Sequence, residues 1–181
     1  TMFKKFTRED LGPLKQFKAS QAKHIKQMIL SQCPGFPIDD VLKKEFPLFS
    51  SNSKIDHSTA ILSNNKIYFF QHKEYFLPTL ELAMKYPDLI KNHVRVDVGA
   101  FKHILDGSDV MAPGLTSAGG DIPDGLVEGD FVLIMGEGKQ HPLAIGQMTQ
   151  SSDVVKKNKQ GIAIKVIQYA GDGVWVDCLE H

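Results

Sequence analysis

The chain has 181 residues, of which 42% are hydrophobic, and its 21 basic residues are balanced by 21 acidic ones. This composition excludes a disordered chain and allows one domain with a large core or two small domains. No apolar run approaches the roughly 20 residues that cross a bilayer, and the first residues do not resemble a signal peptide, so we expect a cytoplasmic protein with no membrane partner.

The first half of the chain alternates short elements. Ser20 offers an N-cap oxygen for a helix through about Gln32, in which apolar residues recur at helical spacing. The SNNK sequence between two extended runs is typical of a hairpin, and Pro78 suits the first turn of a further helix. The pattern predicts strands at 15–19, 58–62 and 67–71, and helices at 20–32, 40–46 and 78–86.

The composition changes near residues 91–93, and short strands with glycine-rich turns follow. Gly107 fits the left-handed position after a short helix at 101–105, and Ser151 or Ser152 can cap a helix at 153–159. Extended runs lie at 94–98, 131–135, 143–148, 162–169 and 174–179. We therefore predict an α+β fold: a small N-terminal α/β domain at 1–92 and a small β-barrel domain at 93–181.

The balanced total charge conceals a polarised chain. Residues 1–92 carry 14 Lys/Arg against 9 Asp/Glu, whereas residues 93–181 carry 7 against 12. The basic excess is concentrated in residues 1–30, in Lys4, Lys5, Arg8, Lys15, Lys18, Lys23 and Lys26. This cluster is either a docking surface for an anionic partner or a lysine-rich solvated surface.

Sequence motifs for catalysis and for cofactors are absent. MGEGKQH (135–141) lacks the first glycine and the Ser/Thr of a phosphate-binding loop, and it also lacks the third glycine of a dinucleotide-binding loop. The seven histidines show no metal-ligand spacing, and Cys33 and Cys178 are too few and too distant for a zinc site or a disulfide scaffold. We expect free thiols, no metal, no cofactor and no enzymatic activity.

The order of motifs in the second half is more specific. VDVGAFKHILDGSDVMAPGLTSAGG, VEGDFVLIM, LAIGQM and GIAIKV together resemble a PUA domain, the RNA-binding pseudobarrel named after pseudouridine synthases and archaeosine transglycosylases. The resemblance runs from Val94 to about Tyr169. It implies that the predicted small barrel is a PUA β-pseudobarrel.

Further segments extend the resemblance over nearly the whole chain. MFKKF, YFLPTLELAMKYP, VMAPGLTSAG, EGKQH and DGVW are similar to the malignant-T-cell-amplified-sequence family of translation factors. That resemblance implies a non-catalytic factor that binds the small (40S) ribosomal subunit and RNA, with a tRNA 3′ end as the expected ligand. It also implies a density-regulated-protein partner, and roles in reinitiation and in recycling of deacylated tRNA.

The resemblance implies that VMAPGLTSAGGDI (110–122) takes part in RNA binding. Glycines allow backbone N–H groups to approach phosphates, and apolar side chains can contact an unstacked base. The alternative is that the glycines only turn the chain, that Met111 and Leu115 are core residues, and that the lysines near residue 157 form a solvated helix face. The candidate RNA contacts are Lys102, His103, Gly107, Met111, Pro113, Gly114, Leu115, Gly119, Gly120, Lys156, Lys157 and Lys159.

The basic residues of 1–30 are the candidate contacts to the ribosome. A protein partner would need an apolar patch, for which the candidates are Phe3 and Phe6 or the aromatic residues among 68–76. Strand alternation requires Phe69 or Phe70 to be core, without indicating which aromatic faces out. An RNA-modification enzyme or its RNA-guiding subunit is the second interpretation, because PUA domains often accompany such enzymes.

Overall fold

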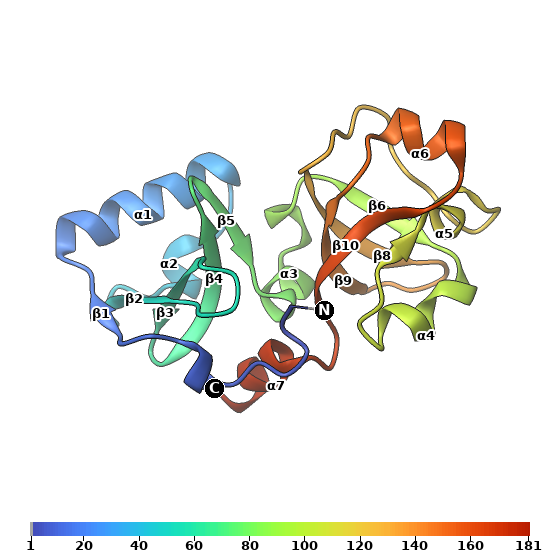
Figure 1. Cartoon of the computed structure of the whole chain (residues 1–181). Helices are drawn as coiled ribbons and strands as arrows, with labels where there is room; N and C mark the ends of the chain where they lie inside the picture. Colours follow the sequence, from blue (N-terminus) through green and yellow to red (C-terminus); the bar gives the residue numbers. More distant parts are fainter. Residues whose placement is uncertain (1) are drawn as a thin grey trace.

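The computed structural model describes residues 2–181; Thr1, the first residue of the predicted N-terminal domain, lies outside the described residues. Two five-stranded sheets follow one another along the chain, the first within residues 15–78 and the second within residues 93–169 (Figure 1). The α+β class predicted from the sequence is confirmed, with helices packed around both sheets.

The first sheet is an antiparallel meander. Its central hairpin turns at Asn64 and Asn65, which both have positive φ angles (49° and 64°), as the SNNK sequence predicts. Helix α1 (Ala19–Gln32) packs Ile25 and Ile29 against one face of this sheet. The strands pair in chain order: β1 (Lys15–Gln16), β2 (Leu48–Asn52), β3 (Thr59–Ser63), β4 (Lys66–His72) and β5 (Tyr75–Pro78).

Both faces of the first sheet are covered, so both phenylalanines at the centre of β4 are core residues. Phe69 faces α1 and packs edge-to-face against Phe76, with ring centroids 6.2 Å apart. Phe70 faces the opposite side and packs against Phe3 from the start of the chain, with centroids 5.0 Å apart. The expectation that at least one of the pair is core is confirmed.

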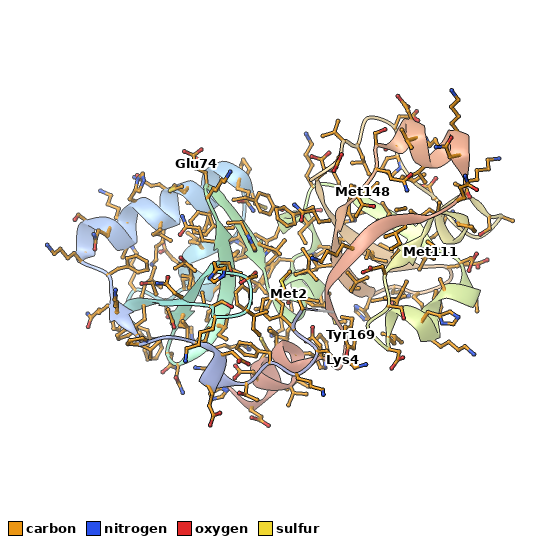
Figure 2. All side chains as sticks on the ribbon, viewed as in Figure 1. Met2, Lys4, Glu74, Met111, Met148 and Tyr169 are labelled. Atoms are coloured by element: carbon orange, nitrogen blue, oxygen red, sulfur yellow. The ribbon has the colours of Figure 1, made fainter. Side chains whose placement is uncertain are left out.

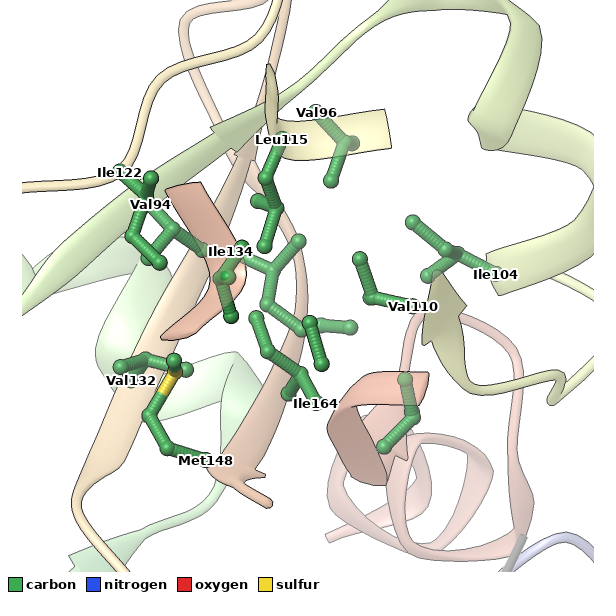
Figure 3. Packing of buried hydrophobic residues seen from close by; sticks show 14 of the residues in the cluster. Val94, Val96, Ile104, Val110, Leu115, Ile122, Val132, Ile134, Met148 and Ile164 are labelled. Carbon is green, nitrogen blue, oxygen red and sulfur yellow. The ribbon is translucent and has the colours of Figure 1, made fainter. Parts of the chain in front are cut away.

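The second sheet curls around its own core in the manner expected of a pseudobarrel. Its strands lie in the order β6-β8-β9-β10-β7, and β6 runs parallel to β8. Val94, Ile134 and Ile164 meet inside (Figure 3). The strands are β6 (His93–Val96), β7 (Val110–Met111), β8 (Phe131–Gly136), β9 (Pro142–Met148) and β10 (Ile162–Tyr169).

Short helices close the second sheet. Ser151 caps α6 (Ser152–Asn158) by accepting from the backbone N–H of Val154, which confirms one of the two predicted caps. Gly107 has φ 91° after α4, the left-handed conformation predicted for it. The other short helices here are the 3-10 turn η3 (Val98–Ala100), α4 (Phe101–Ile104) and α5 (Ala112–Thr116).

The prediction of a strand at 174–179 is wrong, because this segment is helix α7 (Gly173–Glu180). Asp172 caps the helix by accepting from the backbone N–H of Trp175, 2.8 Å away. Val174 and Cys178, four residues apart, are the buried apolar side chains of the helix. The alternation of VWVDCL includes the same two positions, so a period of two concealed the helical spacing.

Several predicted boundaries in the first half also differ. Strands β2 and β5 were not expected. Pro78 ends β5 instead of starting a helix, and Thr79 caps α3 (Leu80–Lys85). The predicted helix at 40–46 is instead α2 (Ile38–Val41), and α1 starts one residue before Ser20. Two 3-10 turns, η1 (Arg8–Asp10) and η2 (Pro87–Leu89), complete the described elements.

One hydrophobic cluster joins the two sheets. It combines Phe70 and Leu77 of the first sheet with Leu133 and Ile145 of the second. Gln168 of β10 is 1% exposed and reaches across the junction: its Oε1 accepts from the backbone N–H of Leu80 at 3.0 Å. The two sheets are therefore held together by packing and by hydrogen bonds that involve buried polar groups.

The two ends of the chain meet beside this junction. The backbone N–H of Gly173 donates to the carbonyl of Phe3 at 3.1 Å. Farther along, Arg8 donates to Asp177 of α7 at 2.7 Å and to the backbone carbonyl of Asn65 at 2.6 Å. Within residues 2–181 no helix is both long enough and apolar enough to cross a membrane.

Candidate nucleic-acid interface

A cavity of about 960 Å³ opens on the second sheet, where α4, β7 and α5 meet β10. The sequence folds this way because Asp97 directly follows β6, and its carboxylate accepts from the backbone N–H of Ala100 at 3.1 Å and starts the turn into α4. Gly107 then turns the chain back into β7. The cavity is lined by both sides of this turn.

The stretch around Pro113 is a helix and not an open loop. Pro113 occupies the first turn of α5, where a missing N–H costs nothing. Gly114 accepts from the backbone N–H of Asp97 at 3.0 Å, and its missing Cβ would face only the Cβ of Ala100, at 3.5 Å. The backbone here is therefore ordered, and at Gly114 there is space on the cavity side.

Two exposed apolar side chains form a platform at the cavity. Met111 of β7 and Ile162 of β10 are direct cross-strand partners, and they are 49% and 44% exposed. This exposure overturns the interpretation of Met111 as a core residue. Leu115, in contrast, is 1% exposed and belongs to the core of the second sheet, as the alternative interpretation held.

The polar groups of the cavity are mostly fixed by the fold. Asp97 also accepts from the hydroxyl of Ser117, and Asp109 accepts from the backbone N–H of Val166 at 3.0 Å. Lys165 and His103 line the cavity with exposed side chains. An incoming anionic ligand would therefore meet the exposed ammonium group of Lys165 and carboxylates that already accept hydrogen bonds.

Five of the predicted RNA contacts line this cavity. They are His103, Gly107, Met111, Pro113 and Gly114. Lys102 is exposed on the same helix as His103 without lining the cavity.

The other predicted contacts lie elsewhere. A second cavity, of about 370 Å³, is lined by Leu115, Gly120, Lys156 and Lys159. Lys156 is paired with Asp124, and this contact lowers the pKa of the Asp124 carboxyl. Gly119 and Lys157 line neither cavity.

Sequence reasoning missed Lys165, Ser108 and Asp109 at the main cavity. A signal existed for Lys165, since it is the one charged residue in the apolar run IAIKVIQY, and alternation places it opposite the buried Ile164 and Val166. Ser108 and Asp109 lie in a turn and had no such signal.

The basic residues of 1–30 divide into three groups. Lys4 reaches the turn after α4, where its Nζ donates to the carbonyl of Asp106 at 3.1 Å, while Lys5 is exposed nearby in the sequence. Arg8 and Lys26 are engaged within the fold, Arg8 with Asp177 and Lys26 with the carbonyl of Leu42. Lys15, Lys18 and Lys23 are exposed on β1 and at the start of α1.

The aromatic candidates for a partner surface are mostly internal. Phe3, Phe6, Phe69, Phe70 and Phe76 are all buried. The ring of Tyr75 stacks on that of Phe131 across the junction, with centroids 4.8 Å apart. Tyr68 is half-buried on β4 and carries the ammonium of Lys66 5.9 Å from its ring centre. Of these aromatic residues, Tyr68 is therefore the one that remains a candidate for contact with a protein partner.

Two known domain families match the chain, and each match covers the residues of one sheet. The chain matches the PUA domain over residues 92–170 and the Pre-PUA-like domain over residues 6–87. A hypothetical protein of the archaeon Pyrococcus horikoshii has a solved structure that superposes with a TM-score of 0.66 at 30% identity, covering 91% of this chain and 98% of that one. A conserved PUA domain protein from Thermoplasma acidophilum superposes with a TM-score of 0.64 at 25% identity over the same shares. The fold is that of a protein with a Pre-PUA-like domain followed by a PUA domain.

Curated relatives narrow this class. Malignant T-cell-amplified sequence 1-A of Xenopus laevis is 38% identical over 178 residues, covering 96% of this chain and 97% of the relative. Translation machinery-associated protein 20 of Saccharomyces cerevisiae is 36% identical over 179 residues, with the same coverage. The chain belongs to the malignant-T-cell-amplified-sequence family, as its sequence motifs indicated.

Proposed function

We propose that this protein is a non-catalytic, translation-associated RNA-binding protein. In this proposal it docks on the small ribosomal subunit and holds an unpaired RNA 3′ end, such as that of a tRNA, in the cavity of its PUA domain. It acts with a density-regulated-protein partner in reinitiation and in the removal of deacylated tRNA, in the cytoplasm. The names of its curated relatives support the association with translation.

The observation that carries the RNA-binding part is the exposed apolar platform of Met111 and Ile162 beside Lys165. A base taken out of its stack needs an apolar surface, and the adjoining phosphate needs a cation. The cavity offers both within one opening. The excess of acidic residues in the second half favours a few local contacts over broad attraction to phosphates.

The site can be tested by filling the space at Gly114. We expect Gly114→Glu to weaken binding of an oligonucleotide ending in CCA about tenfold, because the new carboxylate would project toward the phosphate. The measurement is a fluorescence-anisotropy titration, with a melting curve for each variant to verify folding.

Gly114→Ala is the matched control, because its Cβ meets nothing closer than the Cβ of Ala100, 3.5 Å away. We expect it to bind nearly as tightly as the unchanged protein. Equal binding by a folded Gly114→Glu variant would remove the cavity from the proposal.

A further inference from the structure

Another cavity, polar and of about 520 Å³, lies at the junction of the two sheets. It shares two lining residues with the cavity of the PUA domain, namely Met2 and Lys165. Figure 2 shows Met2 between the two sheets, with Met111 on the side of the second. The two cavities are therefore neighbours separated by these two side chains. We call the cavity of about 960 Å³ the PUA cavity and the cavity of about 520 Å³ the junction cavity.

The exposed charged groups of the junction cavity are positive and belong to Lys73 and Lys165. Lys73 and His57 from the first sheet and Lys165 from the second line it, and all three side chains are exposed. Its one carboxylate, Asp56, has a side chain only 5% exposed and accepts from the backbone N–H and the hydroxyl of Ser58, at 3.1 and 2.6 Å. The negative charge is thus turned inward.

The remaining oxygen of Asp56 faces His72. Oδ2 lies 3.7 Å from Nε2 of His72, and within residues 2–181 neither atom has a hydrogen-bond partner. Burial lowers the pKa of His72, although the nearby Asp56 opposes this. This pair lines the cavity with side chains that are mostly buried, whereas Lys73 and His57 line it with exposed side chains.

The two basic residues of the first sheet occupy positions where a side chain is disfavoured. Lys73 has φ 56° and His57 has φ 60°, the left-handed region that favours Gly and Asn. Lys73 lies in the turn between β4 and β5, His57 lies in the loop between β2 and β3, and both line the junction cavity. Strained backbone conformations of this kind are concentrated at functional sites, where the surrounding structure holds the residue in place despite their cost in free energy.

We propose that the junction cavity binds the sugar–phosphate backbone of the RNA whose 3′ end lies in the PUA cavity. The inference rests on the proposed function and extends it to the N-terminal domain. The strand passes over Lys165, which lines both cavities, and Lys73 and His57 then contact phosphates farther from the 3′ end.

The experiment compares two single-stranded RNAs that end in CCA, one of about four nucleotides and one of about ten. The shorter fills the PUA cavity alone, whereas the longer also reaches the junction cavity. We expect Lys73→Asn and His57→Asn each to weaken binding of the longer RNA about fivefold and to leave the shorter RNA unaffected. Because Asn tolerates the left-handed conformation, both variants should fold. For Lys73→Asn the salt dependence of binding should fall by about 0.7 in slope.

Lys43→Asn is the control, since Lys43 is exposed and lines neither cavity. If the unchanged protein bound neither RNA, the proposed function itself would fail. If it bound both and the two variants matched it on the longer RNA, the path would be overturned while the proposed function stood. Equal weakening of both RNAs would also overturn the path. Weaker binding of an acidic peptide, with RNA unaffected, would assign the cavity to a protein ligand instead.

Discussion

Asp172 is a carboxylic acid held almost entirely out of water at the start of α7. It is 1% exposed, and its two oxygens accept from the backbone N–H groups of Trp175 and Tyr169, at 2.8 and 3.0 Å. Burial raises the pKa of Asp172 from 3.8 to about 6, against the opposing effect of these hydrogen bonds. The cap therefore ionises within the pH range in which proteins are commonly handled.

The raised pKa predicts a dependence of stability on pH. The folded state binds the Asp172 proton more tightly than the unfolded state, so this stabilisation is complete below about pH 4 and is lost as the pH rises through about 6. Asn does not ionise and can still accept from the backbone N–H of Trp175 as a helix cap, while the loss of the second acceptor oxygen, toward Tyr169, is a cost without pH dependence. Between pH 4 and 7, we expect the free energy of unfolding to fall by on the order of 2–3 kcal/mol relative to Asp172→Asn.

Urea unfolding of both proteins across this pH range measures the difference. Asp121→Asn serves as the control, because it removes the charge of an exposed carboxylate. A constant difference between Asp172→Asn and the unchanged protein from pH 4 to 7 would contradict the raised pKa.

At the residues of the site, the sequence predicted chemistry better than it predicted exposure. Met111 and Leu115 are both apolar and four residues apart, yet one is on the surface and the other is in the core. Met111 is exposed because it pairs with Ile162 in the sheet, a contact between residues 51 positions apart. No local pattern contains that pairing.

Among the elements, α5 and the turn after it depend on glycines with different roles. A Cβ on Gly120 would lie 2.5 Å from the carbonyl oxygen of Gly114 and 2.6 Å from the backbone of Leu115. A Cβ on Gly114 would meet the Cβ of Ala100 at an ordinary 3.5 Å. The close approach of the turn to the helix therefore requires glycine at 120 and not at 114.

This contrast predicts opposite effects on stability. Gly120→Ala should lower the free energy of unfolding by about 1–3 kcal/mol, because backbone atoms must move to admit the methyl group. Gly114→Ala should leave it unchanged or raise it by up to about 1 kcal/mol, since Ala favours the helix. Denaturant unfolding of both variants provides the measurement, and equal effects would refute the packing argument.

Elements with one clear period or cap were predictable, and elements fixed by distant contacts were not. The Asn hairpin, α6 with its Ser151 cap and the long strand β10 follow from local patterns. Strand β2 contains two adjacent serines, and Ser51 is buried because its hydroxyl donates to the carbonyl of Gly12 at 2.7 Å. Pro78 ends β5 because the structure places a helix cap directly after it, at Thr79.

Across the whole molecule, the exposed basic residues at the start of the chain concentrate at β1 and α1. Lys15, Lys18 and Lys23 are all exposed, and among the described residues none of the three is in an ion pair. Phosphates of ribosomal RNA would attract such a cluster strongly at low salt. This surface is our proposed contact with the small ribosomal subunit.

We expect the combined change of these three lysines to Glu to abolish salt-sensitive co-sedimentation with 40S subunits. A control with the same change in charge replaces Lys43, Lys91 and Lys139, which are exposed elsewhere. The control should sediment as the unchanged protein does. If both triple variants lost binding equally, net charge and not this surface would account for docking.

The division into two domains near residue 92 stays a prediction. The two sheets share a hydrophobic cluster, so the two halves of the chain are not structurally independent. Leu133 and Ile145 of the second sheet are buried in the same cluster as Phe70 and Leu77 of the first. Residues 1–92 alone would expose that cluster, at an apolar cost of about 25 cal/mol per Å². The composition and the net charge differ between the two sides of residue 92, but no local sequence pattern indicated that the two halves share a core.

Helix α7 has a consequence for how the protein is made. It supplies Val174 and Cys178 to the cluster beneath the first sheet, and Asp177 to Arg8 at the other end of the chain. These residues follow the first sheet in chain order, so the sheet that they cover is synthesised before them. The N-terminal half therefore leaves the ribosome with one face uncovered, and its folding is completed only after α7 has been synthesised.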